Sequence, residues 1–118
     1  MTTEPEPLEI RTDLRAADHA IVAVCGEVDL ETAPELERRL VEVAERGAPV
    51  IVDLTDCQYM DSSGFRALHR AAALGRLVLV IPADAFLSRV VRLAGLAELI
   101  AICDNVGDAT EHLRTAPQ

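Results

Sequence analysis

The sequence predicts a single α/β domain, with a mixed, mostly parallel sheet and helices packed against it. Short, continuous apolar runs at residues 50–54, 77–81 and 99–103 are typical of strands that are buried on both faces, as in parallel sheets. Segments with apolar residues at helical spacing separate these runs, which indicates crossovers between parallel strands. The length of 118 residues fits one domain, because domains cluster near roughly 100–150 residues.

Two strands precede this alternation, which makes the predicted order ββαβαβαβα. Residues 8–14 alternate between apolar and polar side chains, as a strand with one solvent-exposed face does. Residues 21–25 are apolar throughout, so we expect a more buried strand that pairs with the first as a hairpin. We place the domain at residues 8–114, with a disordered N-terminal tail at 1–7 and a C-terminal tail at 115–118.

Capping and helix-breaking residues mark the helices. Thr32 and Glu35 have the spacing of a capping box, so we expect the first helix to begin there and to end at Gly47. The other helices are predicted at 63–74, 86–94 and 106–114. The inward side chains predicted from helical spacing are Leu36, Leu40, Val43 and Ala44 in the first helix, Phe65, Leu68 and Ala72 in the second, and Phe86, Leu87, Val90, Val91 and Ala94 in the third.

The acidic, aromatic-poor composition excludes several classes of function. Asp and Glu total 20 against 11 Lys and Arg, so the chain lacks the basic surface that binding to nucleic acid or to anionic lipid requires. An aromatic content of 3% disfavours base-stacking sites. No apolar run approaches the ~20 residues of a membrane span, and the acidic start differs from a signal peptide. We therefore expect a cytoplasmic protein without membrane insertion.

The sequence offers no catalytic constellation. His19, His69 and His112 lie on separate predicted elements without metal-ligand spacing, and phosphate-binding loops and nucleophile-elbow motifs are absent. We therefore expect no enzyme activity and no metal site. The three cysteines contain no Cys-x-x-Cys, which predicts neither a zinc site nor a disulfide framework. We expect Cys25 and Cys103, which lie in apolar runs, to be buried thiols.

One turn stands apart, at the carboxyl end of a buried strand, where α/β sheets usually carry functional groups. Asp61, Ser62 and Ser63 all favour the N-cap of a helix, so capping alone is one interpretation. Three such residues in a row, flanked by Met60 and Phe65, suggest instead a contact patch, although either apolar side chain can also point into the core. A phosphate on a serine here would be tolerated by the helix N-terminus but not by a partner packed over the turn.

Two stretches carry a resemblance to a known family. Residues 26–33 form a Gly-Glu-Val-Asp-Leu-Glu-Thr-Ala turn, and residues 53–65 contain Asp61-Ser62-Ser63-Gly64 at a strand-to-helix junction. On these stretches, and more weakly on residues 88–96, the chain resembles the STAS domain family, and within it the anti-sigma factor antagonists (anti-anti-sigma factors). The resemblance covers residues 8–113 in the family's order.

The resemblance implies a function in partner switching. It implies that the protein binds an anti-sigma factor that is also a serine/threonine kinase and frees the sigma factor which that kinase holds. The kinase would phosphorylate Ser62, or less favourably Ser63, and a PP2C-type phosphatase would restore the free form. ATP and Mg²⁺ belong to the kinase, so no cofactor is expected in this chain. The implied contact residues are Asp29, Thr32, Met60, Asp61, Ser62, Ser63, Gly64 and Phe65.

A second interpretation assigns the same turn a different role. In it the chain is an unphosphorylated STAS accessory subunit that docks on a transporter or on a large signalling complex. The sequence also departs from the family pattern, since the stretch from Gly64 to Leu77 is shorter than usual and Phe65 stands where Leu is more usual. These departures leave the identity of the kinase open.

Overall fold

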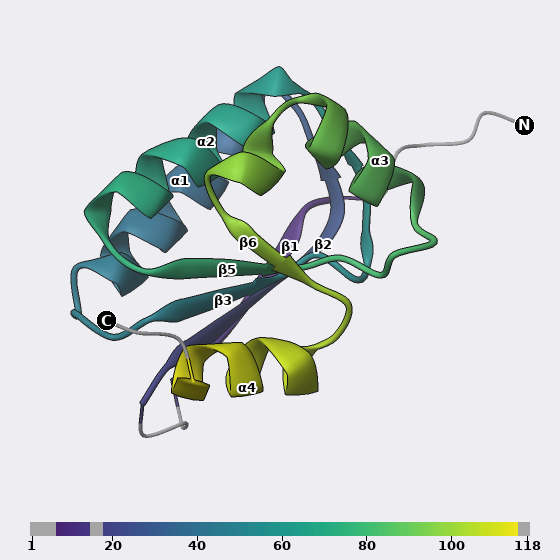
Figure 1. The fold of residues 1–118 in the computed structure, drawn as a ribbon. Helices are drawn as coiled ribbons and strands as arrows, with labels where there is room; N and C mark the ends of the chain where they lie inside the picture. Colours follow the sequence, from purple (N-terminus) through teal and green to yellow (C-terminus); the bar gives the residue numbers. More distant parts are fainter. Residues whose placement is uncertain (1–6, 15–17, 116–118) are drawn as a thin grey trace, which may run out of the picture.

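The computed structural model describes residues 7–14 and 18–115, which form a mixed sheet with helices on both faces (Figure 1). β1 (Glu9–Asp13) pairs antiparallel with β2 (Ala20–Val28), which confirms the predicted hairpin. The order then continues in parallel through β3 (Val50–Asp53), β5 (Leu77–Val80) and β6 (Ala101–Cys103). The α/β class and the mostly parallel sheet are therefore as predicted.

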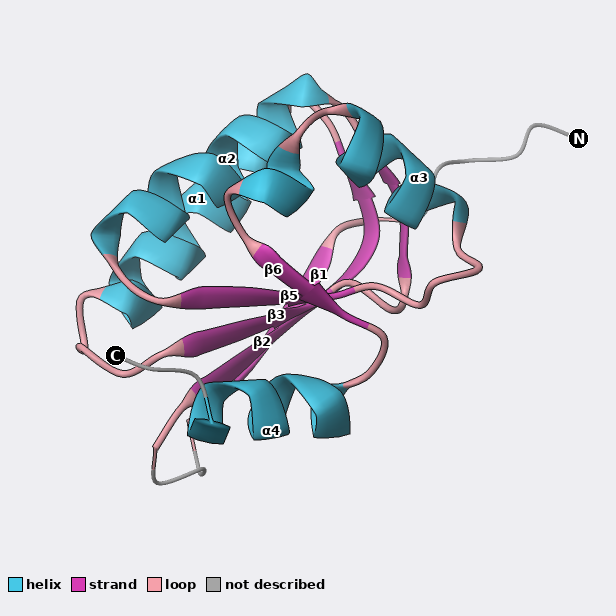
Figure 2. Ribbon diagram, viewed as in Figure 1, coloured by secondary structure: helices cyan, strands magenta, loops and turns pink. Residues whose placement is uncertain are grey.

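The helices divide between the two faces of the sheet (Figure 2). α1 (Ala33–Ala44), α2 (Ser62–Leu74) and α3 (Phe86–Leu93) lie on one face, and α4 (Val106–Thr115) lies on the other. Residues 1–6 and 116–118 of the predicted tails lie outside the described residues, and Thr115 is the last residue of α4. No helix in the described part of the chain combines the length and apolar character that crossing a membrane requires.

The main core fills the space between the sheet and the α1–α2 pair. Full burial of a Leu or Val side chain contributes about 1.5–3 kcal/mol, so this layer supplies much of the folding free energy. Its fully buried side chains include Val22, Val24, Leu36, Leu40, Val52, Leu68 and Leu79. A smaller cluster under α4 contains Ile51, Val78, Val80 and Ala109.

The sequence analysis missed one strand. β4 (Cys57–Met60) pairs in parallel with the last residues of β2, beyond the part of β2 that pairs with β3. Only its two end residues are buried, so its four residues carry too little apolar periodicity to predict a strand. A short 3₁₀ helix at Leu96–Glu98 was also missed, and the last strand begins at Ala101 instead of at residue 99.

The predicted capping box at the start of α1 is wrong. Thr32 is the N-cap residue, but its backbone is helical and its side chain makes no capping hydrogen bond. The Thr32 hydroxyl is instead turned toward the preceding turn, where it contacts the Glu27 carbonyl oxygen and the Asp29 carboxylate. A local side-chain interaction has therefore replaced the cap that the spacing suggested.

Two predicted apolar faces differ in part. The fully buried residues of α2 are Gly64, Ala67, Leu68 and Ala71, while Phe65 and Ala72 are half-buried but still pack against the core, as predicted. In α3, Leu87, Ser88 and Val91 face the core, whereas Phe86 is 76% exposed and Ala94 is also exposed. Helical spacing alone does not fix the rotation of a short helix whose apolar residues cover most of its circumference.

The cysteines differ from the prediction in which thiol is most buried. Cys25 and Cys103 are half-buried, and Cys57 in β4 is the buried one. Burial raises the pKa of the Cys57 thiol to about 11, which makes it a weak nucleophile near neutral pH. These thiols therefore give no indication of a reactive centre.

Candidate functional site

The site is built where two parallel strands end side by side. Val28, the last residue of β2, pairs with Met60, the last residue of β4. The backbone N–H of Asp61 then donates to the Val28 carbonyl oxygen at 3.1 Å, which continues the ladder by one bond. The turns that follow the two strands, residues 29–32 and 61–65, are thereby held together at the carboxyl edge of the sheet.

Asp61 caps α2. Its carboxylate Oδ1 accepts from the backbone N–H of Ser63 at 2.9 Å and also from the Ser63 hydroxyl. The Ser63 hydroxyl is the main cause that lowers the pKa of the Asp61 carboxyl, and the backbone N–H groups of Ser63, Gly64 and Leu30 add to it. The first turn and the start of α2 are linked by the bond from the Asp61 backbone N–H to the Val28 carbonyl oxygen.

The two adjacent serines have different surroundings. The Ser63 side chain is half-buried and bonded to Asp61. Ser62, the first residue of α2, is exposed, and its hydroxyl has no hydrogen-bond partner among the described residues. Of the two hydroxyls, the one on Ser62 is therefore the more exposed, and it is not engaged by the cap.

Gly64 sets how closely α2 approaches the strands beneath it. A Cβ at this position would lie 2.4 Å from Cγ of Met60 and 2.9 Å from Cγ1 of Val28, far inside van der Waals contact. Met60 is itself only 3% exposed, so its side chain supports the turn from below. In this structure Met60 and Gly64 shape the contact patch without forming its surface.

The first turn is held by its own side chains. Asp29 Oδ1 accepts from the backbone N–H groups of Glu31 and Thr32, at 3.0 and 3.1 Å, and the Thr32 Oγ1 accepts from the N–H of Asp29 at 2.9 Å. Gly26, where β2 bulges against β4, has a φ of +92°, a conformation that favours glycine. These bonds occupy Asp29 and Thr32, and they leave Leu30 projecting from the turn with 78% of its surface exposed.

Exposed apolar side chains surround the Ser62 turn. A cavity of about 280 Å³ is lined by Tyr59, Phe65 and Phe86 together with Met60, Leu87 and Val90, and it borders Asp61. Tyr59 is 50% exposed and Phe86 is 76% exposed. The chain has one Tyr, two Phe and no Trp, so all of its aromatic side chains meet at this one cavity. We call the combined surface of Leu30, Tyr59, Asp61, Ser62, Phe65 and Phe86 the turn surface.

Two arginines lie on the other side of the same turn. Arg66 and Arg70 of α2 line a hollow of about 320 Å³ together with Leu30 and Ser63. The Arg70 Nη1 forms an ion pair with the Glu37 Oε1 of α1 at 3.0 Å. Arg66 is exposed and has neither an ion pair nor a side-chain hydrogen bond with any described residue. The turn thus has an aromatic cavity on one side and a free cation on the other.

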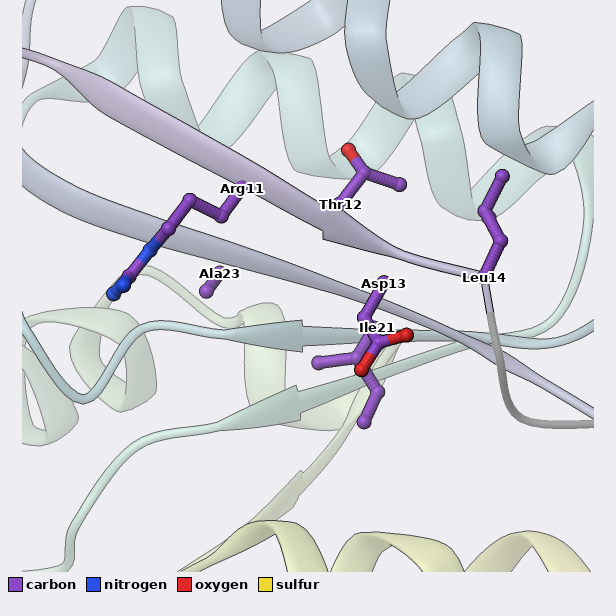
Figure 3. Close-up of a pocket in the computed structure, with 6 residues that line it drawn as sticks. All are labelled: Arg11, Thr12, Asp13, Leu14, Ile21 and Ala23. Carbon is purple, nitrogen blue, oxygen red and sulfur yellow. The ribbon is translucent and has the colours of Figure 1, made fainter.

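A further hollow, of about 430 Å³, lies along the edge strand β1 and its neighbour β2, away from the Ser62 turn. Figure 3 shows Thr12 and Leu14 pointing to one side of the strand, while Arg11 and Asp13 point to the other. Thr12 accepts from the Arg39 Nη2 at 2.9 Å, so it is already engaged by α1. Arg11 and Asp13 share their face of the sheet with their pairing partners Ala23 and Ile21, so the charged groups of this hollow are one cation and one carboxylate from a single strand.

The structure thus gathers the residues predicted to form the site into one place, with differing roles. Asp61, Ser62, Ser63 and Phe65 reach the surface at least in part, whereas Asp29, Thr32, Met60 and Gly64 hold the two turns in shape. The sequence analysis missed Leu30, Tyr59 and Phe86 as surface residues and Arg66 as a free cation. The scarcity of aromatics was visible in the sequence, but their convergence depends on how α3 packs over β4, which no local pattern encodes.

The chain matches a family model and known relatives over most of its length. The family model described as "Mlab, STAS domain" matches residues 12–101. An anti-sigma-B factor antagonist of Listeria monocytogenes is 32% identical over 109 residues, which cover 86% of this chain and 93% of that protein. The anti-sigma-B factor antagonist of Bacillus subtilis (strain 168) is 40% identical over 58 residues, which cover 48% of this chain and about half (53%) of that protein.

Solved structures share the fold. An anti-sigma factor antagonist from Mycobacterium paratuberculosis superposes with a TM-score of 0.84 at 23% identity, covering 96% of this chain and 99% of that one. The phosphorylated form of the Bacillus cell fate determinant SpoIIAA superposes with a TM-score of 0.64 at 18% identity, covering 90% of this chain and all of that one (100%). At these identities the likeness concerns the fold.

Proposed function

The chain belongs to the STAS domain family, and we propose that it is an anti-sigma factor antagonist whose binding is switched off by phosphorylation of Ser62. In this proposal it binds an anti-sigma factor that is also a serine/threonine kinase and so releases the sigma factor that the kinase holds. A PP2C-type phosphatase returns it to the binding form, and the cycle takes place in the cytoplasm. The chain acts as partner and substrate, and ATP and Mg²⁺ are supplied by the kinase.

The observation that supports the proposal most strongly is the free, exposed hydroxyl of Ser62 at the first residue of α2. A kinase needs an accessible hydroxyl whose oxygen can attack the γ-phosphorus of ATP. The new bond joins the Ser62 Oγ to the γ-phosphorus, the bond between that phosphorus and the bridging oxygen of ADP breaks, and the hydroxyl proton passes to a base of the kinase. The neighbouring Ser63 is only partly exposed, and its bond to Asp61 holds its hydroxyl inside the cap, so it is less accessible to a kinase.

The location of Ser62 explains how a phosphate can block binding and leave the fold intact. It adds about −1.5 to −2 charges at a helix N-terminus, where the backbone N–H groups and the helix dipole favour negative charge. A partner that packs on the turn surface would have to desolvate that charge beside the ionised Asp61. Phosphorylation therefore removes the partner through repulsion and desolvation, with no need for the domain to unfold.

The turn surface supplies the binding energy in this proposal. Leu30, Tyr59 and Phe86 are exposed apolar side chains on both sides of Ser62, and exposed aromatic residues commonly anchor interfaces. Asp29 and Thr32 act indirectly, since their hydrogen bonds hold the turn from which Leu30 projects. A partner covering this surface would also cover the Ser62 hydroxyl that it phosphorylates.

The proposal is tested by capture from lysate of the source cells. Full-length protein is used as bait without ATP and with Mg-ATP, and bound proteins and bait phosphopeptides are identified by mass spectrometry. We expect a kinase to be recovered without ATP and lost with ATP, with phosphate on Ser62. Ser62→Ala should retain the kinase in both conditions, and the matched variant Ser63→Ala should behave like wild type. Phosphate mapped to Ser63, or recovery of a transporter in place of a kinase, would overturn the proposal.

A further inference from the structure

We propose that the Arg66 guanidinium binds the phosphate on Ser62 within the same chain. Phosphorylation then adds negative charge at Ser62 and also engages a cation that is otherwise free. This inference rests on the proposed function, because it concerns the phosphorylated form of Ser62. It assigns a role to a residue whose side chain has no partner within the described part of the unphosphorylated chain.

The helix spacing brings the two residues together. Ser62 is the first residue of α2, and Arg66 lies four residues later, one helical turn along the same face. Side chains in this relation have Cβ atoms about 5–6 Å apart, well within the reach of an arginine side chain. A guanidinium group can donate two parallel N–H bonds to phosphate oxygens, a stronger arrangement than a single charge contact.

Arg66 is also the available arginine on this part of α2. Arg70, one turn further, is engaged by Glu37 at 3.0 Å. Both arginines line the hollow between α1 and α2 that contains Ser63, the neighbour of Ser62, and Arg66 is the one without an ion pair among the described residues. A phosphate on Ser62 would therefore meet a cation that needs to break no existing bond.

The other charges near Ser62 make this cation important. Asp61 precedes Ser62 and is ionised, and Asp29 and Glu31 belong to the adjoining turn. These carboxylates oppose a second negative charge, whereas the helix N-terminus and Arg66 favour it. Phosphorylation thus adds a dianion to the turn surface and engages the free Arg66 guanidinium beside it, and both changes alter what a partner meets.

The test measures the second pKa of the phosphate. Full-length protein carrying phosphoserine at position 62, inserted during translation, is titrated by ³¹P NMR alongside the same protein with Arg66→Gln, with Arg66→Lys and with Arg46→Gln. Arg46 is an exposed arginine just beyond α1, so Arg46→Gln gives the same change in net charge away from the turn. We expect Arg66→Gln to raise the second pKa by about 0.3–0.7 unit, since a favourable cation lowers it.

We expect Arg66→Lys to restore part of that shift and Arg46→Gln to leave the wild-type value unchanged. Equal values in wild type and Arg66→Gln, or an equal rise in Arg46→Gln, would overturn the inference. Circular dichroism of each variant verifies that the fold is retained. Because phosphoserine is inserted during translation, this result does not depend on whether a kinase modifies Ser62. Failure of a kinase to modify Ser62 would overturn the proposed function and would leave the role of Arg66 to be decided by this titration.

Discussion

The Asp61 carboxylate accepts hydrogen bonds from both donors of Ser63, the backbone N–H at 2.9 Å and the hydroxyl. This pair makes two neighbouring serines chemically distinct, because one hydroxyl is held inside the cap and the other is left in solvent. The N-cap therefore does more than begin α2. It leaves the Ser62 hydroxyl exposed in the Asp-Ser-Ser-Gly turn, which is the serine that the resemblance had favoured over Ser63.

We predict that Asp61 makes stability pH-dependent in the acidic range. The pKa of the Asp61 carboxyl in the folded protein is below its ordinary value of 3.8. The stability that its charge contributes is therefore fully present above pH 3.8 and is lost as the pH falls through the lower pKa of the folded state. Asp61→Asn keeps a good capping side chain but no charge. Urea unfolding at pH 7, 5 and 3 should show a stability difference from wild type that is largest at pH 7 and shrinks toward pH 3.

The matched control for this prediction is Asp84→Asn, on the exposed loop before α3. It removes the same charge from a carboxylate that has no hydrogen bond or ion pair with any described residue, so its effect on stability should be small. A pH-independent difference between wild type and Asp61→Asn would contradict the role given to the charge of Asp61.

We predict that Gly64→Ala destabilises the domain by about 1–3 kcal/mol, the usual cost of overpacking. The added Cβ meets Met60 and Val28 at 2.4 and 2.9 Å, so α2 has to move away from the strands. Gly75→Ala is the control, since the backbone there is extended and its Cβ would meet only ordinary contact at 4.0 Å. Urea denaturation measures both variants, and a Gly64→Ala protein as stable as wild type would refute this account of the turn.

The sequence predicted most of the fold because its signals are local. Continuous apolar runs gave β3 and β5, and helical spacing gave the buried face of α1, including Leu36 and Leu40. The strand β4 was not predicted because its four residues carry no clear strand pattern of their own. They form a strand through pairing with β2, about thirty residues earlier in the chain. The capping box at Thr32 failed for a related reason, since Asp29 competes for the same hydroxyl.

The candidate site was predictable in position but not in detail. The Asp-Ser-Ser-Gly turn and the turn at Asp29 were both identified, and the structure joins them through the bond between Asp61 and Val28. Which residues face outward was not predictable, because that depends on the rotation of α3 and on the close approach at Gly64. Met60 is the clearest case, since its position beside the serines suggested a surface residue and packing buries it.

We predict that Thr32→Val loosens the first turn and costs about 1–2 kcal/mol of stability. Valine keeps the shape of threonine but loses the hydroxyl that accepts from the Asp29 N–H at 2.9 Å. Thr32→Ser keeps the hydroxyl and serves as the control, with most of the stability retained. Chemical denaturation measures the loss, and hydrogen exchange of the Leu30 and Glu31 amides should speed up in Thr32→Val alone. Unchanged exchange at those amides would contradict the role given to Thr32.

We predict that Phe86→Ser weakens partner capture and leaves stability within about 0.5 kcal/mol of wild type. Phe86 is 76% exposed, so the fold gains little from it, while the turn surface loses an aromatic anchor. Leu74→Ser is the matched control, an exposed apolar residue at the far end of α2. Lysate capture should fall for Phe86→Ser and not for Leu74→Ser, and equal capture by both would remove Phe86 from the interface.

The central claim is that a phosphate on Ser62 ends partner binding while the fold stays intact. It is tested most directly by the dissociation constant of the captured kinase, measured by calorimetry for unmodified protein and for protein with phosphoserine inserted at position 62. We predict that the phosphorylated protein binds at least about tenfold more weakly, equivalent to about 1.4 kcal/mol, with an unchanged circular dichroism spectrum. Equal dissociation constants for the two forms would contradict the claim.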